Sequence, residues 1–178
     1  MLHSNFLKNE SVDPRELNRG RFDIFHNADR FDRVVALTHA QQRDMLALNL
    51  FSGNLMAIPN VVRDLHGNAE APRDKAHGIM LARLTKGKRI DHAIRATAAA
   101  SQSAPGVHLD VYGDGDMHAE LTQQINANNA DEHITLCGYA SDAKDHFRKA
   151  SFSLLTSKQE GQGLVLLESM SAGPYLMS

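Results

Sequence analysis

The chain has 178 residues, 42% hydrophobic and 22% charged, and a formal net charge of −2. This size and composition suit one globular domain, or one domain with part of a neighbour, and they provide enough apolar residues for a core. The small negative charge and the lack of a basic run argue against binding to nucleic acid or to an anionic membrane surface.

Cysteine usage and hydropathy point to a compartment. Cys137 is the only cysteine among the 178 residues, so no disulfide can form within this sequence. A reducing, cytoplasmic setting is therefore favoured. Its apolar surroundings, ITLCGY, predict a core position. No run of about 18 apolar residues occurs, and the N-terminus lacks a basic segment followed by an apolar one. We therefore expect a cytoplasmic protein whose contact with membranes is at most peripheral.

The first part of the chain reads as strand, helix, strand. Residues 34–38 (VVALT) form an aliphatic run, residues 39–48 have a helical pattern, and residues 55–60 (LMAIPN) form a second run. Pro59 and the polar segment that follows, with Gly67 and Pro72, break the pattern. We place a linker at residues 63–77, between a first part at 1–62 and a domain at 78–178.

The second part alternates strands and helices. Strands are predicted at 78–82, 107–112, 133–138, 151–156 and 175–177. Helices are predicted at 89–101, 116–128, 142–150 and 164–172. Strands that alternate with helices of this length imply βαβ units, and right-handed crossovers then give a parallel, doubly wound α/β sheet.

Ligands of open parallel sheets bind beyond the carboxyl ends of the strands, so the residues that follow each strand are the first candidates for ligand binding. Arg83 and Lys88 follow the first of these strands in ARLTKGK. The arginine fork and the mobile lysine ammonium could both reach a phosphate. Two solvated cations beside a helix start are an equally good interpretation from the residues alone.

Two other strand ends carry weaker signals. The GDGD turn after residue 112 holds only G-x-G, so as a dinucleotide fingerprint it is weak, and a plain strand-to-helix turn is favoured. A nicotinamide-dependent dehydrogenase would rest on this turn alone and lacks a catalytic constellation. Tyr139 follows the next strand and could line a flat base, although a surface tyrosine is the simpler interpretation.

The segment SKQEGQGLVLLESM carries the strongest signal. Gly161 and Gly163 allow a ligand to approach the backbone closely, and the helix after them presents unpaired N–H groups to an anion. Glu168 lies inside this apolar helix, where a charge is costly unless it faces a cavity or a polar ligand. Carboxylates accept hydrogen bonds from sugar hydroxyls while amides hold phosphates. With Glu160 before the glycines, the pattern predicts a sugar-nucleotide ligand.

These residues resemble a known family. E-G-x-G-L-V-L-L-E at 160–168, with seven residues between the two acids, is similar to the E-x7-E motif of retaining GT-B glycosyltransferases of the family-four type. A-R-L-x-x-x-K at 82–88 is similar to their diphosphate clamp. The resemblance covers residues 78–178 and departs from the family at Gln162, where an aromatic residue is usual.

The resemblance implies a role for each matching residue. Arg83 and Lys88 would hold the donor diphosphate and stabilise the leaving nucleotide, while Glu160 would face the transferred sugar. Glu168 would bind the ribose. Amide groups would come from the Gly161–Leu164 loop, chiefly from Gly163 and Leu164. Tyr139 would lie beside the base.

The resemblance also implies cofactor use. These enzymes generally need no metal, and the sequence shows no metal-ligand spacing such as H-E-x-x-H. Two cations and a helix terminus would then neutralise the departing diphosphate. We expect no cofactor and a UDP-linked donor.

Residues 1–62 look like the tail of the acceptor domain of bacterial members that glucosylate poly(glycerol phosphate) teichoic acids or protein serines, with His3 in L-H-S-N as a further candidate site residue. The implied enzyme transfers glucose or N-acetylglucosamine to a hydroxyl of a cell-wall polymer or protein. We expect a fragment holding the donor-binding half of a GT-B fold, inactive by itself. The alternative is a non-catalytic nucleotide-sugar-binding module or regulatory partner subunit.

Overall fold

A computed structural model describes residues 27–47, 49, 51, 53–62, 74–158 and 160–177. His3 lies outside the described residues. The chain divides into two compact units. The described part of the first unit runs to Val61 and also includes residues 160–163. The second unit contains the remainder, so it is interrupted just before residue 164.

The first unit contains a small parallel sheet, in agreement with the predicted strand–helix–strand order. Strand β1 (Val34–Ala36) pairs in parallel with β2 (Leu55–Ala57), and helix α2 (His39–Ala47) connects them. The Thr38 hydroxyl accepts a hydrogen bond from the Gln41 amide at 3.0 Å, which satisfies a donor in the first turn of α2. The core of this unit is formed by Ala36, Met45 and Leu55.

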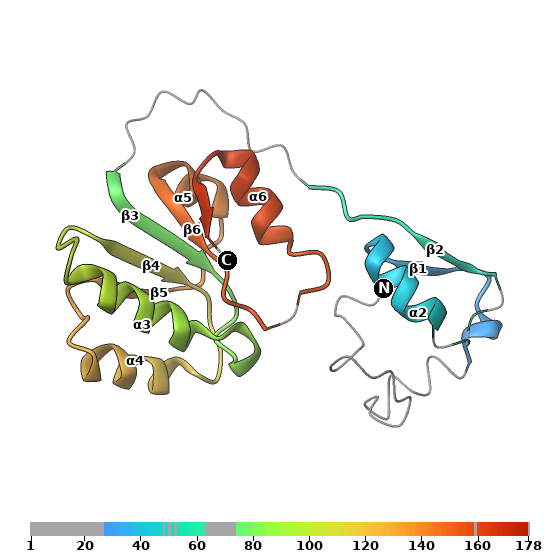
Figure 1. Cartoon of the computed structure of the whole chain (residues 1–178), viewed down its shortest axis with the longest axis horizontal. Helices are drawn as coiled ribbons and strands as arrows, with labels where there is room; N and C mark the ends of the chain where they lie inside the picture. The colour runs from blue at the N-terminus through green and yellow to red at the C-terminus, as the bar shows by residue number, and fades with distance from the viewer. Residues whose placement is uncertain are drawn as a thin grey trace. The chain divides into compact units, whose positions relative to one another are not determined.

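The second unit is built on a five-stranded sheet in the order β5-β4-β3-β6-β7, in which every neighbouring pair is parallel (Figure 1). Its strands are β3 (Asp74–Leu81), β4 (His108–Tyr112), β5 (Ile134–Gly138), β6 (Ala150–Leu154) and β7 (Tyr175–Met177). The predicted doubly wound α/β fold is therefore confirmed.

Helices cover both faces of this sheet. Helices α3 (Ile90–Ser101) and α4 (His118–Ala127) pack on one face, and α5 (Ala143–Lys149) and α6 (Leu164–Ala172) pack on the other. Because successive side chains of a strand point to opposite faces, neighbours in β3 serve different cores. Met80 packs with the α3 and α4 residues, and Ile79 packs with Phe147 of α5.

The start of β3 corrects the predicted linker. The strand begins at Asp74, so the last four residues assigned to the linker at 63–77 belong to the sheet. The sequence did not reveal this start, because residues 74–77 are mostly polar and the apolar run of this strand begins at Gly78. The half-buried His77 side chain is accommodated by a polar partner on the neighbouring strand, its Nε2 lying 2.9 Å from Oδ2 of Asp110. The residues before 74 lie outside the described part of the chain.

No described helix has both the length and the apolar character needed to cross a bilayer.

Candidate nucleotide-sugar site

The strand order places a topological switch point between β3 and β6. From β3 the chain builds outward through β4 to β5, and it then crosses back to β6 on the other side of β3. Connections on the two sides diverge at this point, and open α/β sheets bind their ligands beyond the carboxyl ends of the strands at such a point. The loops after β3 and β6 are therefore the first candidates for a binding site.

The loop after β3 carries both predicted clamp residues. Arg83 lies two residues after the end of the strand and is exposed, and its guanidinium has no partner among the described residues. Lys88 ends a short 3-10 helix, Lys86–Lys88. The next residue, Arg89, adopts a left-handed conformation with φ 49°, which turns the chain into α3.

The GDG turn after β4 is hydrogen-bonded to this loop and packs closely against it. Backbone hydrogen bonds join Ala82 N–H to the Tyr112 carbonyl at 3.0 Å and Leu84 N–H to the Asp114 carbonyl at 2.9 Å. A Cβ on Gly115 would lie 2.5 Å from the Leu84 carbonyl oxygen, and one on Gly113 would overlap the Ala82 carbonyl. The two glycines are thus needed for close packing against the Arg83 loop. This agrees with the interpretation of GDG as a turn.

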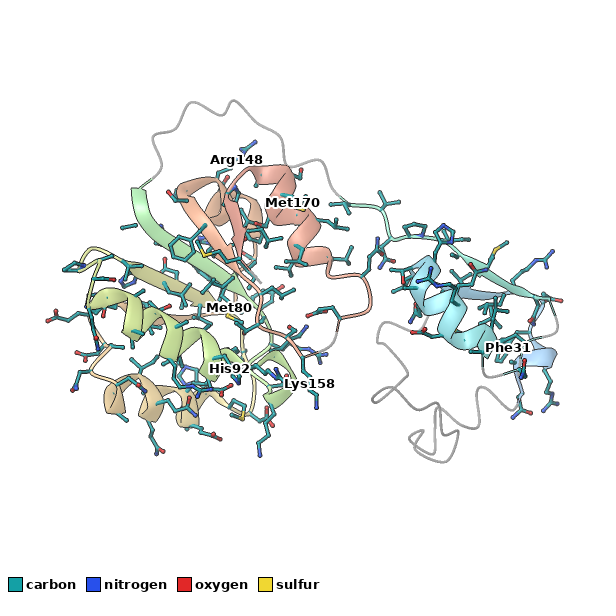
Figure 2. All side chains as sticks on the ribbon, in the orientation of Figure 1. Phe31, Met80, His92, Arg148, Lys158 and Met170 are labelled. Atoms are coloured by element: carbon teal, nitrogen blue, oxygen red, sulfur yellow. The ribbon has the colours of Figure 1, made fainter. Side chains whose placement is uncertain are left out.

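The loop after β6 is hydrogen-bonded to the loop after β3. The Thr156 hydroxyl lies 2.9 Å from the Lys88 carbonyl oxygen and 2.8 Å from the Arg89 carbonyl oxygen. Lys158 N–H donates to the Gly87 carbonyl at 3.0 Å. These hydrogen bonds join the loop after β3 to the loop after β6. They hold the backbone of Lys88 beside residues 156–158. Figure 2 labels Lys158 at this end of the sheet.

Positive charge gathers on these two loops. The cationic residues that they carry are Arg83, Lys86, Lys88, Arg89 and Lys158. Cations held on a backbone framework form a good binding site for a diphosphate, because each can make a charge-assisted hydrogen bond. Arg83 and Lys88 were predicted from the sequence, whereas Thr156 and Lys158 were not, although both follow β6 at the same end of the sheet.

Helix α6 presents Glu168 from a fixed position. Its neighbour Ser169 is fully buried and makes a hydroxyl–hydroxyl hydrogen bond of 2.5 Å with Ser153 of β6, which anchors the helix on the sheet. Glu168 is half-buried, and its carboxylate has no hydrogen-bond or ion-pair partner within the described ranges. Leu164, at the start of the helix, is partly exposed. A half-buried carboxylate without a partner suits hydroxyl recognition.

The remaining motif residues belong to the first unit. Glu160, Gly161 and Gly163 lie in the loop that precedes α6, and Gly163 has φ 64°, a conformation that favours glycine. The structure therefore brings Arg83 and Lys88 together on one unit, and it groups Glu160 with the other.

Tyr139 follows β5, the outermost strand on its side of the sheet, and is 83% exposed. The end of its strand is joined to the GDG turn, because Gly113 N–H donates to the Gly138 carbonyl at 2.7 Å. Tyr139 is therefore attached to the same supporting framework as Arg83. Its proximity to a nucleotide base stays a prediction.

Cys137 and Tyr112 form a separate pair beneath this edge. Burial, strengthened by the nearby Asp110 carboxylate, raises the pKa of the Cys137 thiol to about 11. Burial, with Cys137 and then Asp110 as further causes, raises the pKa of Tyr112 to about 12. Both groups are consequently neutral at physiological pH. Cys137 is half-buried rather than fully inside the core.

The described residues contain no group of three or more His, Cys, Asp or Glu side chains arranged to hold a metal ion.

Comparison with known proteins decides the family. Residues 62–176 match the family described as glycosyl transferases, group 1. The chain belongs to this family. The predicted resemblance is thereby confirmed, and the group 1 assignment covers the whole second unit except its last residues.

Individual group 1 relatives share the same region. The GtfA subunit of a UDP-N-acetylglucosamine–peptide N-acetylglucosaminyltransferase from Limosilactobacillus reuteri is 33% identical over 85% of this chain and 30% of its own length. A poly(glycerol-phosphate) alpha-glucosyltransferase from Bacillus subtilis is 25% identical over 87% of this chain and 24% of its own length. The chain thus spans about a third or less of the relatives that it matches.

A solved structure confirms the architecture. Staphylococcus aureus TarM, crystallised with UDP among its ligands, superposes with a TM-score of 0.87 at 26% identity, over 98% of this chain and 35% of TarM. The predicted Rossmann-like, GT-B type of fold is therefore confirmed.

Proposed function

We propose that this chain provides the donor-binding part of a retaining glycosyltransferase that transfers a hexose from a UDP-sugar to a hydroxyl group. Glucose and N-acetylglucosamine are the expected sugars, since the names of the L. reuteri and B. subtilis relatives specify these two. A cell-wall polymer of the teichoic acid type or a protein is the expected acceptor. The proposal extends what those names say to the present chain.

One observation carries the proposal, namely the cationic switch point. Arg83 and Lys88 lie on a loop that the GDG turn supports and that Thr156 and Lys158 tie to β6. A diphosphate bound there would meet cationic side chains whose backbone is held in place by hydrogen bonds, so the charges are already gathered before the reaction. Other anions would also suit such a site, so the family relationship is what selects a nucleotide sugar.

The proposed roles divide the site between binding and chemistry. Arg83 and Lys88 hold the diphosphate and stabilise it as it leaves. Glu168 accepts hydrogen bonds from the ribose hydroxyls, and Tyr139 lies beside the base. Glu160 faces the sugar, where the oxocarbenium-like charge develops in glycosyl transfer.

We also propose that transfer needs no metal ion, because the loop cations supply the positive charge that a divalent ion would bring to the diphosphate. EDTA should leave UDP binding and transfer unchanged within about twofold, when measured beside a calcium-saturated EDTA control. Activity lost in EDTA and restored by magnesium or manganese would refute this. The single cysteine supports a cytoplasmic location.

Calorimetric titration tests the function itself. The chain is titrated with UDP, GDP, ADP and NAD, and sugar transfer is assayed with the protein as its gene encodes it. We expect tightest binding of UDP and transfer from a UDP-sugar. Binding of UDP without transfer would support a nucleotide-sugar-binding module instead, and preference for NAD would overturn both.

A further inference from the structure

Gln162, between the two glycines of the motif loop, holds a distant backbone segment within the first unit. Its side-chain Oε1 accepts a hydrogen bond of 2.7 Å from the backbone N–H of Asn60, and its Nε2 lies 3.5 Å from the Asn60 carbonyl oxygen. The two residues are 102 positions apart in the chain, and both are half-buried. The side-chain amide of Gln162 therefore faces both backbone groups of Asn60, its N–H and its carbonyl, much as a residue of a neighbouring strand would.

The Asn60 backbone is a firm anchor for this contact. Asn60 follows β2, which is paired with β1, and the pairing continues past the strand because Ile58 N–H donates to the Ala36 carbonyl at 2.9 Å. Pro59 then restricts the backbone between Ile58 and Asn60, since its ring fixes φ. Gln162 is thus bonded to the rigid end of the small sheet.

The loop that Gln162 anchors contains residues with large backbone conformational freedom. Glycine has the largest backbone freedom of any residue, and Gly161 and Gly163 flank Gln162 on both sides. Fixing such residues costs conformational entropy, so a side-chain bond between them has a large effect on how well the loop is ordered. Glu160 stands two positions before Gln162 on this loop.

We propose that Gln162 is a positioning residue for transfer, which holds the loop of Glu160 to Asn60 and so fixes the carboxylate that faces the sugar. This inference rests on the proposed function of Glu160. The side chains proposed to bind UDP, namely those of Arg83, Lys88 and Glu168, lie on the second unit. Of the proposed amide donors, only those of Gly161 and Gly163 lie on the loop that Gln162 holds. Loss of the Gln162 contact should consequently lower turnover and spare UDP affinity.

Three variants separate this role from a general effect on folding. Gln162→Leu removes the hydrogen bond and keeps a side chain of similar size. Gln162→Glu keeps an acceptor oxygen for the Asn60 N–H. Asn60→Ala is the matched control, because it removes the Asn60 side chain and leaves the backbone groups that Gln162 contacts.

Two measurements are made on each variant. Amide hydrogen exchange at Asn60, followed by NMR, reports the hydrogen bond directly and needs no activity. Steady-state kinetics with a UDP-sugar, together with UDP titration, report the consequence for transfer. Loss of one hydrogen bond between neutral groups corresponds to about a two- to tenfold change.

In Gln162→Leu we expect faster exchange at Asn60, kcat lowered about two- to tenfold, and a UDP Kd within about twofold of the parent. Gln162→Glu should restore slow exchange and most of the turnover, and Asn60→Ala should resemble the parent. Unchanged exchange at Asn60 in Gln162→Leu would overturn the contact. Faster exchange with unchanged kcat, or equal losses of kcat and UDP affinity, would overturn the positioning role. A parent that neither binds UDP nor transfers sugar would instead refute the proposed function, while exchange at Asn60 would still decide whether Gln162 holds the loop.

Discussion

The loop after β3 carries the predicted clamp residues, and the loop before α6 carries Glu160. Different interactions hold the two loops in place. Backbone hydrogen bonds to the GDG turn, close glycine packing and the Thr156 hydroxyl fix the loop of Arg83 and Lys88. The other loop is anchored by the Gln162 side chain, which lies between two glycines and bonds to the Asn60 backbone. The loop proposed to bind the diphosphate thus has a backbone framework, whereas Glu160, proposed to face the sugar, lies on a loop that a side-chain hydrogen bond anchors.

The largest effect is expected from breaking the framework under the first loop. In Gly115→Ala, the new Cβ would lie 2.5 Å from the Leu84 carbonyl oxygen, so the backbone must move. Overpacking of this kind costs about 1–3 kcal/mol, or about 2–12 °C in Tm for a chain of this size. Displacing the loop disturbs both clamp residues, so UDP affinity should fall about a hundredfold or more.

Gly87→Ala is the matched control, because a Cβ at Gly87 would meet no atom within 4 Å. Calorimetric melting and UDP titration of the two variants give the comparison. Equal behaviour of Gly115→Ala and Gly87→Ala would show that close packing does not support the loop.

Removing one cation from the framework should have the next largest effect. Lys88→Ala deletes a charge-assisted contact worth about 1.5–3 kcal/mol, which lowers UDP affinity about ten- to a hundredfold. Lys149→Ala, at the exposed end of α5, removes a charge away from the switch point and should bind UDP as the parent does. If Lys88→Ala binds UDP as tightly as Lys149→Ala, the clamp assignment is wrong.

A smaller effect is expected from loosening the tie between the β3 and β6 loops. Thr156→Val keeps the shape of the side chain and removes the hydroxyl that bonds the Lys88 and Arg89 carbonyls. UDP affinity should fall about two- to tenfold, as for one neutral hydrogen bond. Thr156→Ser retains the hydroxyl and should bind UDP normally, and a loss in the serine variant as large as in valine would rule out the hydroxyl as the cause.

The sequence predicted the second unit well and the cross-connections poorly. Strand and helix periodicity gave the parallel α/β fold, and helix α6 at 164–172 has the predicted limits. The polar start of β3 was missed because His77 does not read as a strand residue until Asp110 is seen beside it. Contacts such as Thr156 with Lys88 and Gln162 with Asn60 join residues far apart in the chain, and periodicity carries no information about such pairs.

The two glutamates provide the most direct test of the division between a binding framework and a reacting loop. Glu168 lies on a helix anchored by Ser169 and should serve the nucleotide, whereas Glu160 should serve the transferred sugar. In the protein as its gene encodes it, Glu168→Gln should weaken UDP and UDP-sugar binding about tenfold. Glu160→Gln should leave the UDP Kd within about twofold and lower kcat, as expected when a contact is made mainly in the transition state. Equal losses of UDP affinity in both variants, with kcat preserved in Glu160→Gln, would contradict this division.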